Sequence, residues 1–391
     1  MLATQIKDRS ITVLPARPRV AFYCQHSVGL GHLMRTLRLA SGLRIDAEII
    51  IICGGSMPAS IPLADDLHVI TLAPLAMHAD GTLYDPAGDR PAEAILEERA
   101  AYLGELAATL TLDAVIVEMY PFGRKKFRAE ILSLVNSARR HSAATIICSV
   151  RDILVTSRRD QERFDNNALE RLNQEFDLVL VHADPAFVGL DVSFPHVNDI
   201  RIPLHYTGYI GPQITRDSDE RAPRVMVSAG GGRVGQRLRE AAAAAAPAIK
   251  REFGLSMTIV AGALAADSAA ARRDDDIEYV DFIADFPAAL SDTRLSISQC
   301  GYNTFADVLA AGTPAVYVPF ETPREDEQLR RAQFSEQRGI GALVREVDLT
   351  PETLLDAARR ALALQPAALP AADGVRQARQ RILECIEHVR H

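Results

Sequence analysis

Short apolar runs alternate along the chain with segments of helical length. The runs are rich in Val and Ile. Strands of this kind, separated by helix-length segments, are typical of βαβ units in a parallel sheet that is buried on both faces. We therefore predict an α/β domain over residues 19–205. Its predicted strands are Val20–Cys24, Ile49–Cys53, Val69–Leu72, Ala114–Val117, Thr145–Val150 and Leu178–His182.

The alternation stops at about Leu204 and begins again after Pro223. The stretch between them contains Gly, Pro and a cluster of charges without a sustained period, which predicts a linker over residues 206–222. A second α/β domain is expected over residues 223–373. Its predicted strands are Val225–Ala229, Met257–Ala261, Glu278–Phe282, Leu295–Gln299, Ala315–Pro319 and Ala342–Val344.

The two ends of the chain differ from these domains. Residues 1–18 form a polar leader, and the amphipathic segment Gly374–His391 predicts a last helix that packs back on the N-terminal domain. Two similar domains joined by a linker imply a cleft between them, where ligands usually bind. Other predicted helices are Ala92–Leu110, Arg128–His141, Gln236–Glu252, Thr304–Ala311, Asp326–Arg338 and Pro351–Leu364.

Composition narrows the possible classes of protein. The chain has 391 residues, more than one hydrophobic core usually supports, and 48% of them are hydrophobic, which argues against wholesale disorder. A formal charge of −8 argues against a nucleic-acid partner. No apolar stretch is long enough to span a bilayer, and we expect a cytoplasmic protein, with peripheral membrane contact left open. The predicted buried free thiols are Cys24, Cys53, Cys148, Cys300 and Cys385.

A glycine triplet opens the second domain. In VMVSAGGGRVGQRLREA a strand is followed by Gly230, Gly231 and Gly232 and then by a helix. This geometry presents backbone N–H groups and a positive helix end to a phosphate, and Arg233 adds a charge-assisted contact. The spacing matches neither the P-loop nor the dinucleotide fingerprint, and a plain tight turn is the alternative interpretation.

A second strand–turn–helix segment follows in SISQCGYNTFADVLAAGTPAVYVPF. Gly301, Asn303 and Thr304 lie at a helix N-terminus, and Asp307 falls in the first turn. An acid at that position either favours the helix dipole or holds the hydroxyls of a ribose. After the next strand, the segment ETPREDEQLRRAQF opens another helix with Glu327 and Gln328.

These motifs together resemble the donor half of GT-B glycosyltransferases, in particular the UDP-N-acetylglucosamine transferases of lipid II synthesis. The resemblance implies that Gly231, Gly232, Arg233 and Thr304 face the donor diphosphate. It also implies that Asp307 holds the ribose, that Glu327 and Gln328 meet the donor sugar, and that Phe282 and Ile283 flank the uracil. The ribose-binding residue of that family is a glutamate, and the shorter Asp307 leaves the identity of the donor open.

The segment GLGHLMR, at the start of the first domain, contains Gly29, Gly31, His32 and Arg35. It is similar to the G-x-G-H-x-x-R loop of GT-B transferases and to the UDP-sugar hydrolase of pseudaminic acid biosynthesis. The resemblance implies that His32 stands at the cleft as a base. A neutral imidazole suits this task because its unperturbed pKa is about 6.5. A histidine that merely begins a helix after two glycines is the alternative.

Three further polar residues follow strands of the first domain. Glu118 ends one predicted strand, and Arg151 and Asp152 follow another. Residues just beyond the carboxyl ends of parallel strands face the ligand crevice. We predict that Glu118 and Asp152 are catalytic residues that orient the acceptor or support His32. Pairing of Arg151 with Asp152 or with another acid is an equal alternative.

The sequence therefore predicts a metal-independent glycosyltransferase without a cofactor. It uses a nucleotide sugar, expected to be a UDP-sugar, and inverts the anomeric centre with His32 as base. The expected acceptor is a small molecule or peptide. No two histidines have the helical spacing of a metal pair, and the cysteines are dispersed. A nucleotide-sugar hydrolase or epimerase on the same fold, and a sugar-nucleotide-binding protein without activity, are the alternatives.

Overall fold

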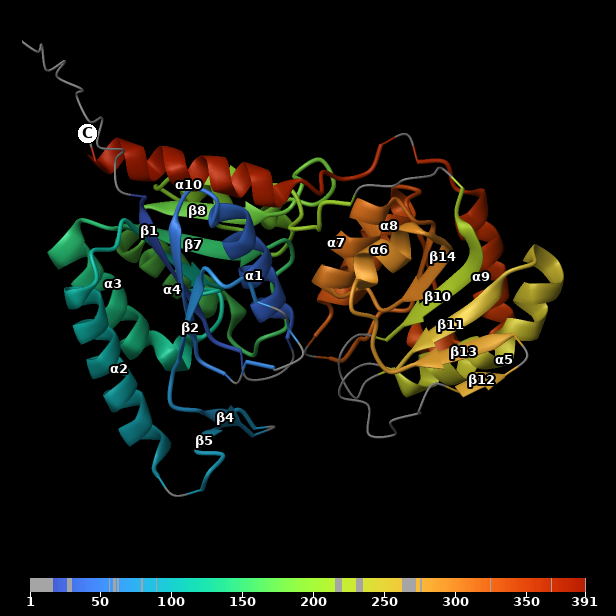
Figure 1. The fold of residues 1–391 in the computed structure, drawn as a ribbon, viewed down its shortest axis with the longest axis horizontal. Helices are drawn as coiled ribbons and strands as arrows, with labels where there is room; N and C mark the ends of the chain where they lie inside the picture. The colour runs from blue at the N-terminus through green and yellow to red at the C-terminus, as the bar shows by residue number, and fades with distance from the viewer. Residues whose placement is uncertain are drawn as a thin grey trace, which may run out of the picture.

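The computed structural model describes residues 17–26, 30–55, 57–58, 61, 63–78, 80–88, 90–214, 220–229, 235–261, 272–274, 276–323, 325–366 and 368–390. Two sheets with helices packed around them form two lobes, which lie side by side in Figure 1. The predicted α/β class, with two parallel-sheet domains, is confirmed. The predicted leader lies largely outside the described residues.

The first lobe contains a seven-stranded sheet of order β3-β2-β1-β6-β7-β8-β9, and all its strand pairs are parallel. Its strands are β1 (Arg19–Cys24), β2 (Glu48–Cys53), β3 (Leu67–Thr71), β6 (Ala114–Glu118), β7 (Thr145–Arg151), β8 (Leu178–His182) and β9 (Leu204–Tyr206). Its helices are α1 (Gly31–Leu43), α2 (Ala92–Thr109), α3 (Arg128–Ser142) and α4 (Gln161–Glu175). Beside the sheet, β4 (Ala76–Met77) and β5 (Leu83–Tyr84) form a hairpin.

The second lobe contains a seven-stranded sheet of order β12-β13-β11-β10-β14-β15-β16, in which only the edge strand β12 is antiparallel. Its strands are β10 (Ala222–Ser228), β11 (Ser256–Val260), β12 (Arg272–Asp274), β13 (Ile277–Val280), β14 (Thr293–Ser298), β15 (Ala315–Tyr317) and β16 (Ala342–Leu343). The helices after β10 are α5 (Gln236–Phe253), α6 (Phe286–Ser291), α7 (Tyr302–Ala311), α8 (Glu327–Gln337), α9 (Pro351–Ala363) and α10 (Gly374–Arg390). Short 3₁₀ helices cover Lys125–Phe127, Leu190–Val192, Val197–Asp199 and Glu346–Asp348.

The last helix, α10, crosses back to the first lobe, along which it lies in red in Figure 1. It packs against α1, where Gly42 leaves room for Val375 because a Cβ on that glycine would overlap the valine side chain. An ion pair between Arg379 and Asp46 joins α10 to the turn that follows α1. The two lobes are therefore connected both by the segment before β10 and by the segment that leads into α10.

The strands form because their side chains are apolar on both faces. In β2 the residues Ile49–Cys53 are all buried, as expected for a strand covered by helices on both sides. The predicted linker overlaps a strand at each end, since Tyr206 is the last residue of the edge strand β9 and Ala222 is the first residue of β10. The hairpin and β12 were not predicted, because two or three residues are too few to show a period. Among the described helices, none combines the length and apolar character needed to cross a membrane.

Candidate active site

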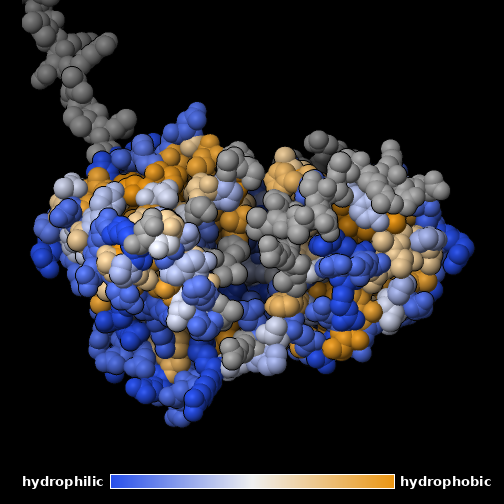
Figure 2. Space-filling model, turned by 90° about the horizontal axis from the view of Figure 1, so that it is seen from below, coloured by the Kyte–Doolittle hydropathy of each residue, from blue (hydrophilic) through white to orange (hydrophobic). Residues whose placement is uncertain are grey.

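A cavity of about 1060 Å³ lies between the two lobes, and Figure 2 shows the recess from below. One wall is α1, and the opposite wall is formed by the segment after β13 and by the starts of α7 and α8. The predicted site residues that line it are Gly31, His32, Arg35, Arg151, Phe282, Ile283, Gly301, Asn303, Thr304, Asp307, Glu327 and Gln328. The other predicted loop residues, Gly29, Gly230, Gly231, Gly232 and Arg233, lie outside the described residues.

His32 stands at the start of α1, with its side chain 20% exposed on the cavity wall. Its Nδ1 lies 3.0 Å from Oε1 of Glu118, the last residue of β6. Arg35, one helical turn further along α1, pairs with the same carboxylate. With its proton on Nδ1, His32 donates to Glu118 and keeps a lone pair on Nε2, the arrangement that a general base requires. Glu118 thus stands behind His32 and supports it.

Burial and charge hold this pair in fixed protonation states. Burial lowers the pKa of His32 to about 4, and the hydrogen bond to Glu118 offsets only part of that shift. Burial by itself would raise the pKa of Glu118, but the Arg35 guanidinium and His32 outweigh it and hold the pKa well below its usual range. At neutral pH the site therefore contains a neutral imidazole against a carboxylate.

A second row of buried groups fixes Glu118 in turn. The Ser149 hydroxyl donates to Glu118 Oε2 at 2.9 Å and lies 2.9 Å from Nε2 of His182. The other ring nitrogen of His182 lies 3.0 Å from the hydroxyl of Thr207. Burial lowers the pKa of His182 to about 3, so this histidine is also neutral. The row restricts the movement of Glu118 and, through it, of His32.

The row predicts a pH-dependent stability, because a histidine whose folded-state pKa is depressed binds its proton only on unfolding. The wild-type free energy of unfolding should therefore decrease as the pH falls below about 6.5, the unperturbed pKa of histidine. In His182→Gln the slope of this free energy against pH should be smaller by up to about 1.4 kcal/mol per pH unit. Urea unfolding between pH 6.5 and 4.5 measures it, with the exposed His68→Gln as control. If the free energy of unfolding had the same slope against pH in all three proteins, His182 would not be the neutral, buried histidine that we assign.

Asp307 lies across the cavity from α1, in α7, and is 6% exposed. Its Oδ1 pairs with the Arg38 guanidinium at 2.6 Å, so the acid and its partner come from different lobes. Burial raises the pKa of Asp307 to about 6, although Arg38 opposes the shift. Asp307 thus lines the cavity as a buried acid paired across the lobes, and is not merely a surface charge on the helix.

Two more contacts join the walls of the cavity. Arg151, at the end of β7, pairs with Glu327, the first residue of α8, at 3.1 Å. The alternative in which Arg151 pairs with another acid is therefore the one observed. Asn303 donates from Nδ2 to the Gly31 carbonyl at 3.0 Å. A ligand that enters between the lobes meets side chains from both of them.

Asp152 does not line the cavity. It is fully buried, and its two oxygens each accept from the Arg331 guanidinium at 2.7 Å. The Tyr209 hydroxyl and the Ile153 amide donate to the same carboxylate. We therefore assign Asp152 to the contact between the lobes and not to the predicted role at the acceptor, because its lone pairs are already used.

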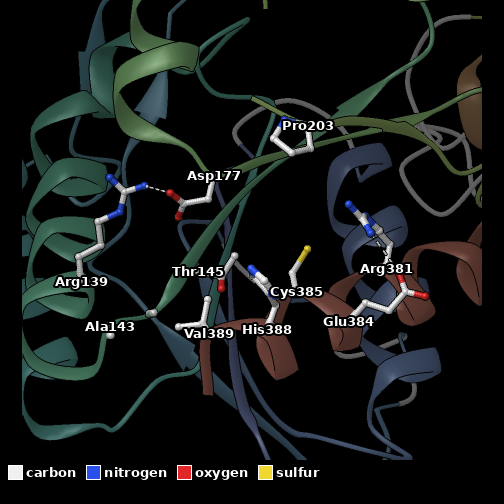
Figure 3. Close-up of a pocket in the computed structure, with 11 residues that line it drawn as sticks. Arg139, Ala143, Thr145, Asp177, Pro203, Arg381, Glu384, Cys385, His388 and Val389 are labelled. Carbon is white, nitrogen blue, oxygen red and sulfur yellow. Dashed lines mark hydrogen bonds and ion pairs between the residues drawn. The ribbon is translucent and has the colours of Figure 1, made fainter. Parts of the chain in front are cut away.

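A second cavity, of about 730 Å³, lies at the other edge of the first sheet, between α3 and α10 (Figure 3). Its charged side chains are paired with each other, Arg139 with Asp177 at 2.7 Å and Arg381 with Glu384 at 3.1 Å. It therefore offers no free charge to a ligand. In the part of the chain that the structure describes, no three His, Cys, Asp or Glu side chains gather as a metal site.

Sequence reasoning missed several residues at the site. Arg38 lies one helical turn beyond Arg35, where the sequence alone predicts a solvent-exposed side chain. Ser149 and His182 lie within or at the end of predicted strands. Tyr302 donates to the His182 carbonyl and accepts from the Ile210 amide, which joins the lobes behind the cavity. The signal was present for Tyr302, which lies inside the CGYNTFAD motif.

Comparison with known proteins agrees with this geometry. A model of the glycosyltransferase family 28 C-terminal domain matches residues 226–384, which include the Asp307 and Glu327 wall of the cavity. Residues 226–384 are therefore similar to that domain. The predicted resemblance of the donor half is thereby confirmed.

Individual relatives extend the comparison to the first lobe. A UDP-N-acetylglucosamine–N-acetylmuramyl-(pentapeptide) pyrophosphoryl-undecaprenol N-acetylglucosamine transferase of Exiguobacterium sp. is 28% identical over 188 residues. The match covers 45% of this chain, which spans about half (51%) of that relative. The structure is similar to MurG of Acinetobacter baumannii (TM-score 0.53, 17% identity, 95% of this chain and 99% of that one). It is also similar to the calicheamicin glycosyltransferase CalG4 (TM-score 0.57, 18% identity, 95% of both chains). The chain thus has a GT-B fold, as predicted.

Proposed function

We propose that the protein is a glycosyltransferase that transfers a sugar from a UDP-sugar to a hydroxyl or amine of a small-molecule or peptide acceptor. The observation that carries the proposal is the neutral His32, held by Glu118, opposite a family 28 domain across one cavity. A base on one lobe and a donor half on the other is the arrangement that sugar transfer needs. The activity for which the Exiguobacterium relative is named supports UDP-N-acetylglucosamine as the first donor to test.

The proposed reaction needs one proton transfer. The acceptor oxygen or nitrogen attacks the anomeric carbon as the bond to the diphosphate breaks, and His32 Nε2 takes the acceptor proton. A base of low pKa accepts that proton late, when the new bond has made the acceptor group acidic. In-line attack inverts the anomeric centre. We propose that backbone amides and Arg233 stabilise the departing diphosphate without a metal.

The second wall would hold the donor. Glu327 and Gln328 begin α8 at the cavity, which supports a role for them in binding the donor sugar. Phe282, which is 55% exposed, and Ile283 offer an apolar surface on which the uracil ring of the donor would lie. Exposed aromatic side chains on a cavity wall have no packing role of their own, which supports stacking on a ligand. The five cysteines are free thiols, which supports a cytoplasmic location for the reaction.

Nucleotide binding tests the donor half. We expect UDP to raise the melting temperature of the protein more than uridine does at the same concentration, because the diphosphate contributes to binding. Equal shifts would remove the diphosphate site. If neither UDP nor any other nucleoside diphosphate in a panel binds, the proposed function is wrong.

Asp307→Asn should weaken UDP binding about tenfold, because the ribose hydroxyls lose a charged acceptor. Wild-type affinity should also decrease as the pH falls through about 6, where Asp307 becomes protonated, and the variant should not show this decrease. Titration calorimetry at pH 5 and pH 8 measures both effects. The exposed Asp356→Asn serves as control. Unchanged affinity in Asp307→Asn would leave Asp307 as a partner of Arg38 only.

A further inference from the structure

Arg124 lies in the loop that follows Glu118, and the described residues offer its guanidinium no ion-pair partner. It follows β6 and immediately precedes the 3₁₀ helix Lys125–Phe127. Its Nε is buried, and among the described residues no hydrogen-bond acceptor lies within reach of that atom. No carboxylate of the described residues forms an ion pair with its guanidinium, whereas Arg35, Arg38 and Arg151 each have one. A guanidinium has five N–H donors, and leaving a buried one such as this Nε without an acceptor is unfavourable.

The backbone holds Arg124 in an unusual conformation. Its φ is 59°, in the left-handed region that side chains other than glycine rarely adopt. Met119, earlier in the same loop, has a φ of 65°. Strained residues of this kind cluster at ligand sites, where the surrounding structure keeps them in place. Within the part of the chain that the structure describes, no ion-pair partner accounts for the position of this side chain.

The charges around Arg124 belong to the acceptor side of the proposed site. Arg124 acts electrostatically on His32, Glu118 and Arg151. Glu118 is already engaged by Arg35 and His32, and therefore is not free to neutralise a third group. Arg151 contacts Glu327 through Nη1, while its Nε is buried without an acceptor among the described residues. Two guanidiniums with unused donors thus lie near the base, in a chain whose formal charge is −8.

We propose that Arg124, together with the unused donors of Arg151, binds an oxyanion of the acceptor, either a carboxylate or a phosphate. The proposal rests on the glycosyltransferase function above and names the class of its acceptor. Guanidinium groups match both oxyanions with paired hydrogen bonds. An acceptor without such a group would leave Arg124 uncompensated, so the pair selects for anionic acceptors as well as binding them. Arg124 belongs to the lobe opposite the family 28 domain, which places it away from the proposed donor wall.

The test uses the full chain saturated with UDP, so that the donor site is already filled. Inorganic phosphate and acetate are titrated separately, with sodium chloride at equal ionic strength as reference. We expect one of the two anions to bind, phosphate for a phosphorylated acceptor or acetate for a carboxylate. Arg124→Met should weaken that binding at least about tenfold. Arg124→Lys, which keeps the charge but not the paired hydrogen bonds, should give an intermediate loss, and the exposed Arg163→Met should give none.

Two results would contradict the proposed anion site and leave the proposed glycosyltransferase function intact. One is UDP-loaded wild-type protein that binds neither anion better than chloride. The other is Arg124→Met protein that loses UDP as strongly as it loses the anion, which would make Arg124 a donor residue. Failure of the wild type to bind UDP at all is a different result, since it removes the proposed function itself. Circular dichroism of each variant before titration shows that it is folded, and Arg124→Lys keeps the test decisive if Arg124→Met is not.

Discussion

Replacing His32 by alanine should lower kcat about 10²- to 10⁴-fold, the usual contribution of a positioned general base. UDP affinity should stay unchanged, because His32 belongs to α1 and the proposed donor wall belongs to the other lobe. Steady-state kinetics together with UDP titration separates the two quantities. The variant His68→Ala, in which an exposed histidine of β3 is removed, is the matched control and should keep full activity.

The companion variant Glu118→Gln examines how the base is held. It keeps the shape of the side chain but removes the charge that Arg35 and His32 share. We expect kcat to fall while the KM of the donor stays the same, because Glu118 acts through His32 and does not line the cavity. Full activity of His32→Ala would refute the base. Loss of UDP binding by a folded His32→Ala protein would instead make His32 a donor contact.

Replacing Arg331 by methionine should lower the free energy of unfolding by about 3–5 kcal/mol. Arg331 and Asp152 are both fully buried, and their ion pair joins α8 to the segment after β7. Removal of the guanidinium leaves the Asp152 carboxylate buried without its charge partner, and it also leaves the Cys300 carbonyl without the Arg331 donor at 2.6 Å. Removing one partner of a buried ion pair lowers the free energy of unfolding far more than replacing both partners does, because the remaining charge stays buried without a partner.

Three further variants make this result specific. Arg359→Met removes one side of an exposed pair with Glu252 and should change stability little. Asp152→Asn alone should also destabilise the protein. The double variant Asp152→Asn/Arg331→Met should lose less than the sum of the two single variants. Urea unfolding at pH 7 measures all four proteins, and additive losses would show that the two side chains do not act as a pair.

The sequence was sufficient for the fold and for the walls of the site. Apolar runs such as Ile49–Cys53 predict buried parallel strands, because strands covered on both faces are continuously apolar and do not alternate with polar residues. The same rule predicts that Glu118 and Arg151 lie at the carboxyl edge of the sheet, where they are found. The resemblance to GT-B glycosyltransferases then indicates which residues of α7 and α8 line the opposite wall of the cleft.

The roles of the residues at that edge could not be predicted from the sequence alone. Glu118 and Asp152 both follow strands of one sheet, and yet one supports His32 while the other pairs with Arg331. The difference depends on which side chains of the other lobe stand opposite, and a single sequence does not specify the approach of two lobes. For the same reason the partner of Asp307, Arg38, was not predicted.

The central claim is that a sugar passes across the cavity to an acceptor with His32 as base. Mass spectrometry of reactions that contain UDP-N-acetylglucosamine and a panel of anionic and neutral acceptors tests it most directly. The account predicts one glycosylated acceptor for each UDP released, and almost none of either with His32→Ala. UDP released together with an equal amount of free sugar, whether or not an acceptor is present, would contradict the claim and indicate a hydrolase.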